Sequence, residues 1–156
     1  MRTYSLLLFF HSLFRWLVLS GLLFTLSRAA LRWTGQKSFT RLDNKLRHIT
    51  ATLAHVQLTL GYVLYFNSPL VQWFRTHFRE AVRQLPVVFF GLIHIILMTL
   101  AITFITIGSA VAKRKSTDLE KFRTMTLWYG VALAIILLAI PWPFSPLAKR
   151  PFFRTF

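Results

Sequence analysis

The sequence predicts an all-α integral membrane protein: an antiparallel bundle of four transmembrane helices with one short interfacial amphipathic helix. Hydrophobic residues make up 55% of the 156 residues and charged residues only 15%, which is too little polar surface for a soluble domain of this size. The charges are also clustered, so residues 48–74, 84–112 and 124–148 contain none, and residues 3–27 contain only Arg15. Each stretch can supply the ~20 residues that cross a hydrocarbon layer of ~30 Å.

The boundaries of the helices follow from capping and breaking residues. Asp43 or Asn44 fits the N-cap of the second helix, and Thr117 with Glu120 has the spacing of a capping box before the fourth. Pro141 ends the fourth helix. We expect the membrane helices at about residues 4–31, 46–66, 86–112 and 122–142, within a single membrane domain that covers residues 1–156.

A shorter amphipathic helix is predicted between the second and third spans. Ser68 before Pro69 fits an N-cap followed by proline at the first helical position. Over residues 69–85 one side is apolar and the other basic, which is typical of a helix that lies along the membrane surface. The apolar side consists of Leu70, Phe74, Phe78, Ala81 and Leu85, and the basic side of Arg75, Arg79 and Arg83.

The net charge of +15 fits basic residues that flank membrane spans and contact lipid phosphates. Nucleic acid is not an expected partner, because the chain has no basic soluble module and no nucleic-acid-binding motif. The absence of cysteine excludes disulfides, thiolate metal sites and covalently attached haem. The four acidic residues all lie outside the apolar stretches, so a hydrolase is not expected. Any enzymatic role would be at most that of an electron-transfer subunit.

The basic residues are divided unevenly between the two ends of the predicted bundle. The first and third connections carry 11 Lys and Arg residues, and the opposite end carries seven. The positive-inside rule therefore predicts that both termini lie outside the cytoplasm. The 11 are Arg28, Arg32, Lys37, Arg41, Lys45, Arg47, Lys113, Arg114, Lys115, Lys121 and Arg123, and the seven are Arg2, Arg75, Arg79, Arg83, Lys149, Arg150 and Arg154.

Polar residues recur on one side of the second predicted helix at intervals of 4, 3, 4 and 3 residues. This is the seam spacing of packed helices, so we expect the stripe to face the bundle interior. The stripe consists of His48, Thr52, His55, Thr59 and Tyr62. On the other helices, His11 shares a face with Arg15, and Gly91 shares a face with His94 and Met98.

Several of these side chains are expected at similar depths. Counted inward from the outer helix ends at 1.5 Å per residue, His11 lies about 10 Å deep, His94 about 12 Å, and Arg15 and His55 about 16 Å. Arg15 cannot lose its charge, and no acidic residue lies in a span. It therefore requires an anion such as a haem propionate, a quinone oxygen, a lipid phosphate or an acid of another subunit, unless helix-end carbonyls or water bind it.

Histidines on facing helices are suited to axial ligation of b-type haem. We expect His55 and His94 to be the iron ligands, with His11 as the substitute if the first helix lies closer. The alternative is that each histidine only forms hydrogen bonds between helices. The number of histidines allows at most one bis-histidine haem in a chain.

Smaller residues complete the expected cofactor site. Thr52 and Thr59 could hold ring nitrogens or propionates, and Gly91 would make room for the macrocycle. His48 is expected at the membrane edge and His77 in the surface segment.

Five segments of the chain, "HSLFRW", "FTRLDNKL", "HVQLTLGYVLYFNSP", "AITFITIGSAVAKRKSTDLEKF" and "IPWPF", resemble a family of small four-helix bacterial membrane proteins that often carry a cytochrome b label. The resemblance covers the whole chain and implies His11, Arg15, His55 and His94 as the positions of interest. It also implies the bacterial cytoplasmic (inner) membrane, in which the termini predicted outside by the positive-inside rule would be periplasmic.

The function expected from these observations is that of a haem-b-binding, cytochrome-like subunit that transfers electrons near the outer leaflet, with quinone as a further candidate cofactor. The alternative is a cofactor-free accessory or assembly subunit of a larger inner-membrane complex. Expected partners are the lipid bilayer and either other membrane subunits or further copies of the chain.

Overall fold

The protein is described by a computed structural model that covers residues 2–148, 150 and 151. Within these residues it is all-helical, with four helical stretches long and apolar enough to cross a membrane: Thr3–Thr34, Arg41–Phe66, Leu85–Arg114 and Asp118–Ala139. This confirms the predicted helical class and the four candidate spans. The elements are α1 (Arg2–Thr34), α2 (Arg41–Phe66), α3 (Pro69–Thr76), α4 (Phe78–Ala81), α5 (Leu85–Val88), the π-helical turn η1 (Phe89–Ile93), α6 (His94–Arg114) and α7 (Asp118–Ala139).

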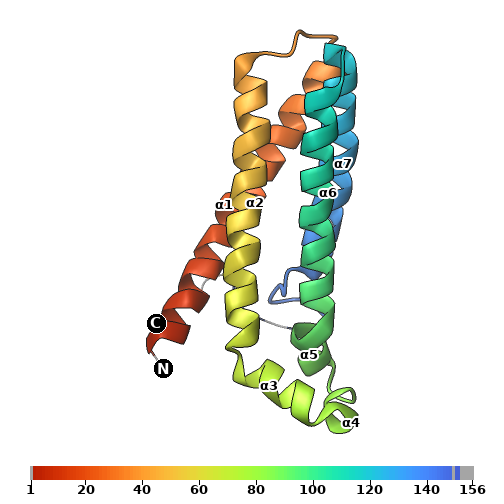
Figure 1. The fold of residues 1–156 in the computed structure, drawn as a ribbon. Coiled ribbons are helices and arrows are strands. Elements are labelled where there is room, and N and C mark those ends of the chain that lie inside the picture. Colours follow the sequence, from red (N-terminus) through yellow and green to blue (C-terminus); the bar gives the residue numbers. More distant parts are fainter. Residues whose placement is uncertain (1, 149, 152–156) are drawn as a thin grey trace.

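The four long helices form a ring in which α1 packs on α2, α2 on α6, α6 on α7 and α7 on α1. Helix α1 therefore lies diagonally across from α6. The short connections α1–α2 and α6–α7 lie at one end of the molecule, and α3, α4 and α5 lie at the other (Figure 1). The described part of the segment after α7 folds back beside the helices at this second end (Figure 1).

The capping residues explain where the helices begin. Thr40 is the N-cap of α2, where its hydroxyl accepts from the backbone N–H of Asp43 and the Asp43 carboxylate accepts from the backbone N–H of Thr40. The prediction of Asp43 or Asn44 as the N-cap is therefore wrong, because Asp43 occupies the third helical position of a capping box. The predicted caps Ser68, followed by Pro69, and Thr117 are confirmed.

Polar contacts join the helices at the end that holds the α1–α2 connection. The carboxylate of Asp43 is only 2% exposed and forms ion pairs with Arg28 at 2.7 Å and Arg32 at 3.5 Å. One turn further along α2, the guanidinium of Arg47 is buried and donates to the backbone carbonyl of Ser109 on α6 at 3.0 Å. These contacts satisfy charges that would otherwise be buried without partners.

The segment between α2 and the third span differs from the single interfacial helix predicted over residues 69–85. Helix α3 ends at Thr76, and His77 separates it from the short α4. Phe74 and Ala81 are buried as expected, whereas Phe78 and Leu85 of the predicted apolar side are exposed. The basic side is exposed throughout: Arg75, Arg79 and Arg83.

The contact between α6 and α7 depends on a glycine. An added Cβ at Gly108 would lie 2.4 Å from the Cβ of Trp128, which is closer than real side chains approach. Gly130, on α7, has no neighbouring atom within 4 Å of an added Cβ. Packing of α7 on α6 therefore requires glycine at position 108. At position 130 glycine has only its intrinsic cost in a helix.

We predict that Gly108→Ala lowers the free energy of unfolding by about 1–3 kcal/mol, because the added methyl group overpacks the α6–α7 contact. The matched change Gly130→Ala should raise the free energy of unfolding by up to about 1 kcal/mol through helix propensity. Thermal unfolding of the purified protein in detergent, followed by tryptophan fluorescence, measures both. Equal shifts in the two variants would contradict this account of the packing.

Candidate ligand-binding cavity

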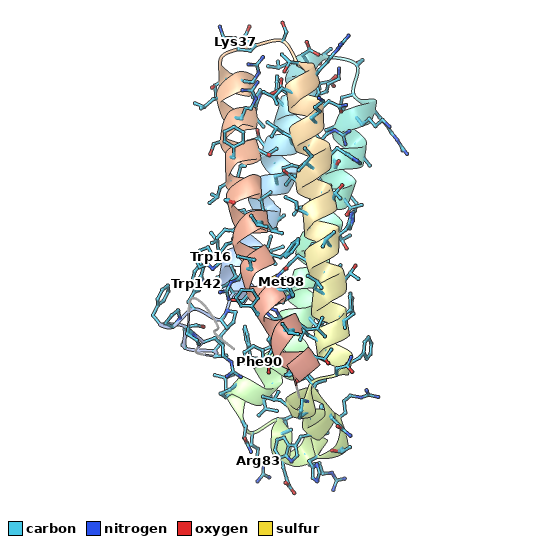
Figure 2. All side chains as sticks on the ribbon, turned by 90° about the vertical axis from the view of Figure 1, so that its left-hand side faces the viewer. Trp16, Lys37, Arg83, Phe90, Met98 and Trp142 are labelled. Carbon is cyan, nitrogen blue, oxygen red and sulfur yellow. The ribbon has the colours of Figure 1, made fainter. Side chains whose placement is uncertain are left out.

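A cavity of about 450 Å³ lies in the half of the molecule that holds α3, with walls from α1, α2, α3, η1, α6 and the segment after α7. Most of its lining is apolar, including Met98 and Phe90, which lie toward the end away from Lys37 (Figure 2). No Asp or Glu is found among the described residues that line it. Its charged and strongly polar side chains are His11, Arg15, Gln57, His94 and Arg150.

His94 is the first residue of α6 and follows directly on the π-helical turn η1. The Nδ1 of His94 lies 2.8 Å from the backbone carbonyl oxygen of Ala139. Because a carbonyl only accepts, Nδ1 carries the ring hydrogen, and a neutral imidazole then has its lone pair on Nε2. Within the part of the chain that the structure describes, no hydrogen bond is made to this Nε2.

The turn before His94 is held by the helices around it. Tyr65 of α2 donates its hydroxyl hydrogen to the carbonyl of Gly91 at 2.9 Å. An added Cβ at Gly91 would lie 2.5 Å from Cγ of Phe74. Gly91 thus makes room for Phe74 of α3, and the expectation that it makes room for a macrocycle is wrong.

His11 faces the cavity from α1 and is held by Gln57 of α2. The side-chain amide of Gln57 donates to the backbone carbonyl of His11 at 2.9 Å and lies 3.4 Å from its Nε2. An added Cβ at Gly61 would lie 3.3 Å from Cε1 of His11, so this glycine lets the imidazole pack against α2. The Nδ1 of His11 and the Oε1 of Gln57 are buried and have no hydrogen-bond partner among the described residues.

These contacts define the protonation of His11. The amide of Gln57 can only donate through Nε2, so the Nε2 of His11 accepts and its ring hydrogen lies on Nδ1. His11 and His94 therefore have the same tautomer, with the lone pair on Nε2. A neutral imidazole with its lone pair on Nε2 is the form that ligates metals. In the described part of the chain the lone pair of His94 has no hydrogen bond, whereas that of His11 accepts from Gln57 at 3.4 Å.

Two guanidinium groups border the same cavity. Arg15 donates to the hydroxyl of Ser12 at 3.3 Å, and its guanidinium lies 5.4 Å from the ring centre of Trp16. Arg150, from the segment after α7, lies 4.8 Å from the ring centre of Phe90. With two cations and no lining carboxylate among the described residues, the cavity favours an anionic ligand.

His55 lies away from this cavity. Its Nε2 is 2.9 Å from the hydroxyl of Thr106 on α6, and Thr106 follows His94 by twelve residues, a rise of about 18 Å. The ring of His55 is also exposed on the outside of the bundle. The expectation that His55 and His94 face one iron is therefore wrong.

The two threonines of the polar stripe on α2 share this orientation, whereas Tyr62 is half-buried and lines the cavity. Thr52 and Thr59 are exposed, and each donates its hydroxyl hydrogen to the carbonyl four residues earlier in α2. The prediction that the stripe faces the interior is wrong for these residues because small residues occupy the packing face. That inward face contains Thr50, Ala51, Ala54, Gln57 and Leu64, of which Gln57 is half-buried.

Two further histidines also lie outside the cavity. His48 is exposed near the start of α2. His77 is exposed, lies 2.8 Å from the hydroxyl of Thr76 and stacks on Trp73 with ring centres 5.6 Å apart. The described residues contain no group of three or more His, Cys, Asp or Glu side chains that could hold a metal ion.

Sequence reasoning missed Gln57 and Arg150. Gln57 follows His55 by two residues, about 200° around the helix, so only one of them can face inward. The small residues Ala54 and Gly61, on the same side as Gln57, were the signal for the inward face. Arg150 carries no signal of its own, because it reaches the cavity only after the chain folds back beyond Pro141.

The fold and the cavity together define a class of protein: an all-helical chain with four candidate membrane spans and a cationic, histidine-lined cavity. Comparisons with protein-family models, with curated proteins and with solved structures found no match.

Proposed function

We propose that the chain is an antiparallel transmembrane bundle that binds one haem b in this cavity and transfers electrons as a cytochrome-like membrane subunit. In this proposal His94 and His11 would hold the haem iron. The observation that carries it is the composition of one cavity: two imidazoles with their lone pairs on Nε2, of which that of His11 accepts a hydrogen bond from Gln57 at 3.4 Å, together with two guanidinium groups and no lining carboxylate among the described residues.

The residues present fit the chemical demands of haem b. A metal-ligating histidine usually donates its second ring N–H to a carbonyl or carboxylate, as His94 does to Ala139. Haem b carries two propionates, and Arg15 and Arg150 supply two cations that can bind carboxylates. The apolar lining would exclude water around the macrocycle. When bound, the haem would supply a reversible one-electron couple.

A quinone is a weaker candidate for the same cavity. Its carbonyl oxygens could accept hydrogen bonds from Arg15 or from the Nδ1–H of His11. A neutral quinone would nevertheless bring no negative charge to a cavity that two guanidinium groups border, so it matches the charge of the cavity less well than an anionic ligand does. A cofactor-free accessory subunit, with a lipid phosphate at the cations, is the remaining alternative.

We predict that the purified protein shows the Soret band and the reduced α-band of a low-spin haem b. His94→Ala and His11→Ala should each abolish the low-spin α-band, because bis-imidazole ligation requires both rings. His55→Ala is the matched control and should retain the full band, since His55 lies outside the cavity. Reduced-minus-oxidised visible spectra of the three variants and the wild type measure this.

A spectrum without a Soret band, after expression with ample haem, would contradict haem binding and favour the accessory-subunit role. Loss of the α-band in His55→Ala, with retention in His11→Ala, would instead restore His55 as a ligand and contradict the assignment made from the cavity.

The orientation of the bundle is part of the proposal. The α1–α2 and α6–α7 connections, with the helix ends beside them, carry the 11 basic residues and lie at one end of the molecule (Figure 1). We place this end in the cytoplasm of a bacterial cell by the positive-inside rule. The cavity then lies toward the outer leaflet of the inner membrane. Of the seven basic residues at the other end, Lys149 and Arg154 lie outside the described residues.

We predict that a reporter fused after Phe156 behaves as a periplasmic fusion, because the end with fewer basic residues is the translocated one. The same reporter inserted at Ser116, in the α6–α7 connection, should behave as a cytoplasmic fusion. Alkaline phosphatase and green fluorescent protein fusions report the two compartments in opposite senses. Cytoplasmic activity after Phe156 would reverse the orientation and place the cavity toward the inner leaflet.

A further inference from the structure

The outer face of the α2–α6 pair carries polar side chains where a transmembrane helix would meet lipid. Thr52, His55 and Thr59 on α2 and Thr103 and Thr106 on α6 are all exposed. They lie in the middle parts of the candidate spans Arg41–Phe66 and Leu85–Arg114. We refer to these five residues as the threonine groove.

Each threonine of the groove uses its hydroxyl hydrogen within its own helix. The four hydroxyls donate to the carbonyl four residues earlier, at distances of 2.7 to 3.0 Å. Such back-bonds satisfy the only hydrogen of a threonine and leave the oxygen able to accept. The acceptor carbonyls belong to His48 for Thr52, His55 for Thr59, Thr99 for Thr103 and Ile102 for Thr106.

The hydrogen bonds of Thr106 also determine which ring nitrogen of His55 carries the hydrogen. Because the hydroxyl hydrogen of Thr106 is used by the carbonyl of Ile102, its oxygen accepts from Nε2–H of His55. A neutral His55 then has a lone pair on Nδ1, for which the described part of the chain provides no hydrogen bond. The threonine groove therefore consists of hydrogen-bond acceptors only.

Because the threonine groove offers only hydrogen-bond acceptors, a molecule that covers it must supply donors. Lipid tails have no hydrogen to donate. A second copy of the chain would present the same acceptors, and it would bring the exposed Lys45, Lys113 and Arg114 at the end of the α2–α6 face against their counterparts. A partner with cationic donors is disfavoured by the net charge of +15.

We propose that the threonine groove is the docking surface for a transmembrane helix of another membrane protein, one that presents uncharged hydrogen-bond donors, namely the carboxamides of Asn or Gln. A carboxamide donates two hydrogens and carries no charge, so it can satisfy His55 and a neighbouring threonine oxygen together. Polar side chains of this kind join transmembrane helices. The proposal is independent of haem binding, because His55 lies away from the cavity.

The experiment measures binding of a model transmembrane peptide in lipid vesicles. The chain has no cysteine, so Lys37→Cys, in the exposed α1–α2 connection, provides a single site for a fluorescent donor. The peptides are a polyleucine helix with one central Asn and the same helix without it, each carrying an acceptor at a low peptide-to-lipid ratio. Energy transfer should show the Asn peptide binding about 3- to 20-fold more tightly than the leucine peptide.

His55→Leu should remove the preference for the Asn peptide, and it should fold normally because the side chain is exposed. Thr103→Val, which retains His55, should reduce the preference only in part. The matched control is Val131→Leu, an exposed position on α7, which lies diagonally across from α2, and it should retain the full preference. The haem spectrum of His55→Leu is recorded in parallel and should be unchanged, because His55 lies outside the cavity. Loss of peptide binding can then be distinguished from loss of the cofactor.

Equal binding of the two peptides to the wild-type chain would overturn the proposal. A second outcome would also overturn it: energy transfer between donor-labelled and acceptor-labelled copies of the chain, if His55→Leu abolishes that transfer. The threonine groove would then be covered by a second copy.

Discussion

In a membrane, exclusion of water from the hydrocarbon core would constrain every polar side chain between the ends of the four candidate spans. The chain meets the constraint in three ways. At one end Asp43 neutralises Arg28 and Arg32, and Arg47 donates to Ser109 across two helices. Along the spans the threonines donate back to their own helices. In the remaining region His11, Arg15, Gln57, His94 and Arg150 surround a cavity.

The cavity differs from the other two arrangements because some of its buried polar atoms have no hydrogen-bond partner among the described residues. Asp43 gives the basic end its carboxylate, whereas no carboxylate lines the cavity among the described residues. The Nδ1 of His11 and the Oε1 of Gln57 are buried without hydrogen bonds in that part of the chain. Such groups are costly unless something binds them, and this supports the proposal of a bound ligand in the cavity.

Much of the fold could be predicted because length, hydropathy and capping are local properties of the sequence. The four spans and the caps at Ser68 and Thr117 belong to this class. The inward face of α2 was not predictable from polarity, because close packing of Ala51 and Ala54 determines which side faces the other helices. The threonines of α2 tolerate exposure because each donates its hydroxyl hydrogen to a carbonyl of its own helix. The π-helical turn before His94 and the position of Arg150 at the cavity depend on tertiary contacts, which the spacing of residues in the sequence does not reveal.

The central claim is that one cavity holds one haem b between α1 and α6. It is tested most directly by the haem content of the wild-type protein, purified after expression with ample haem and measured as the pyridine haemochrome. The account predicts about one haem b per chain, the number that one pair of histidines can ligate. A preparation of folded protein that contains no haem would contradict it.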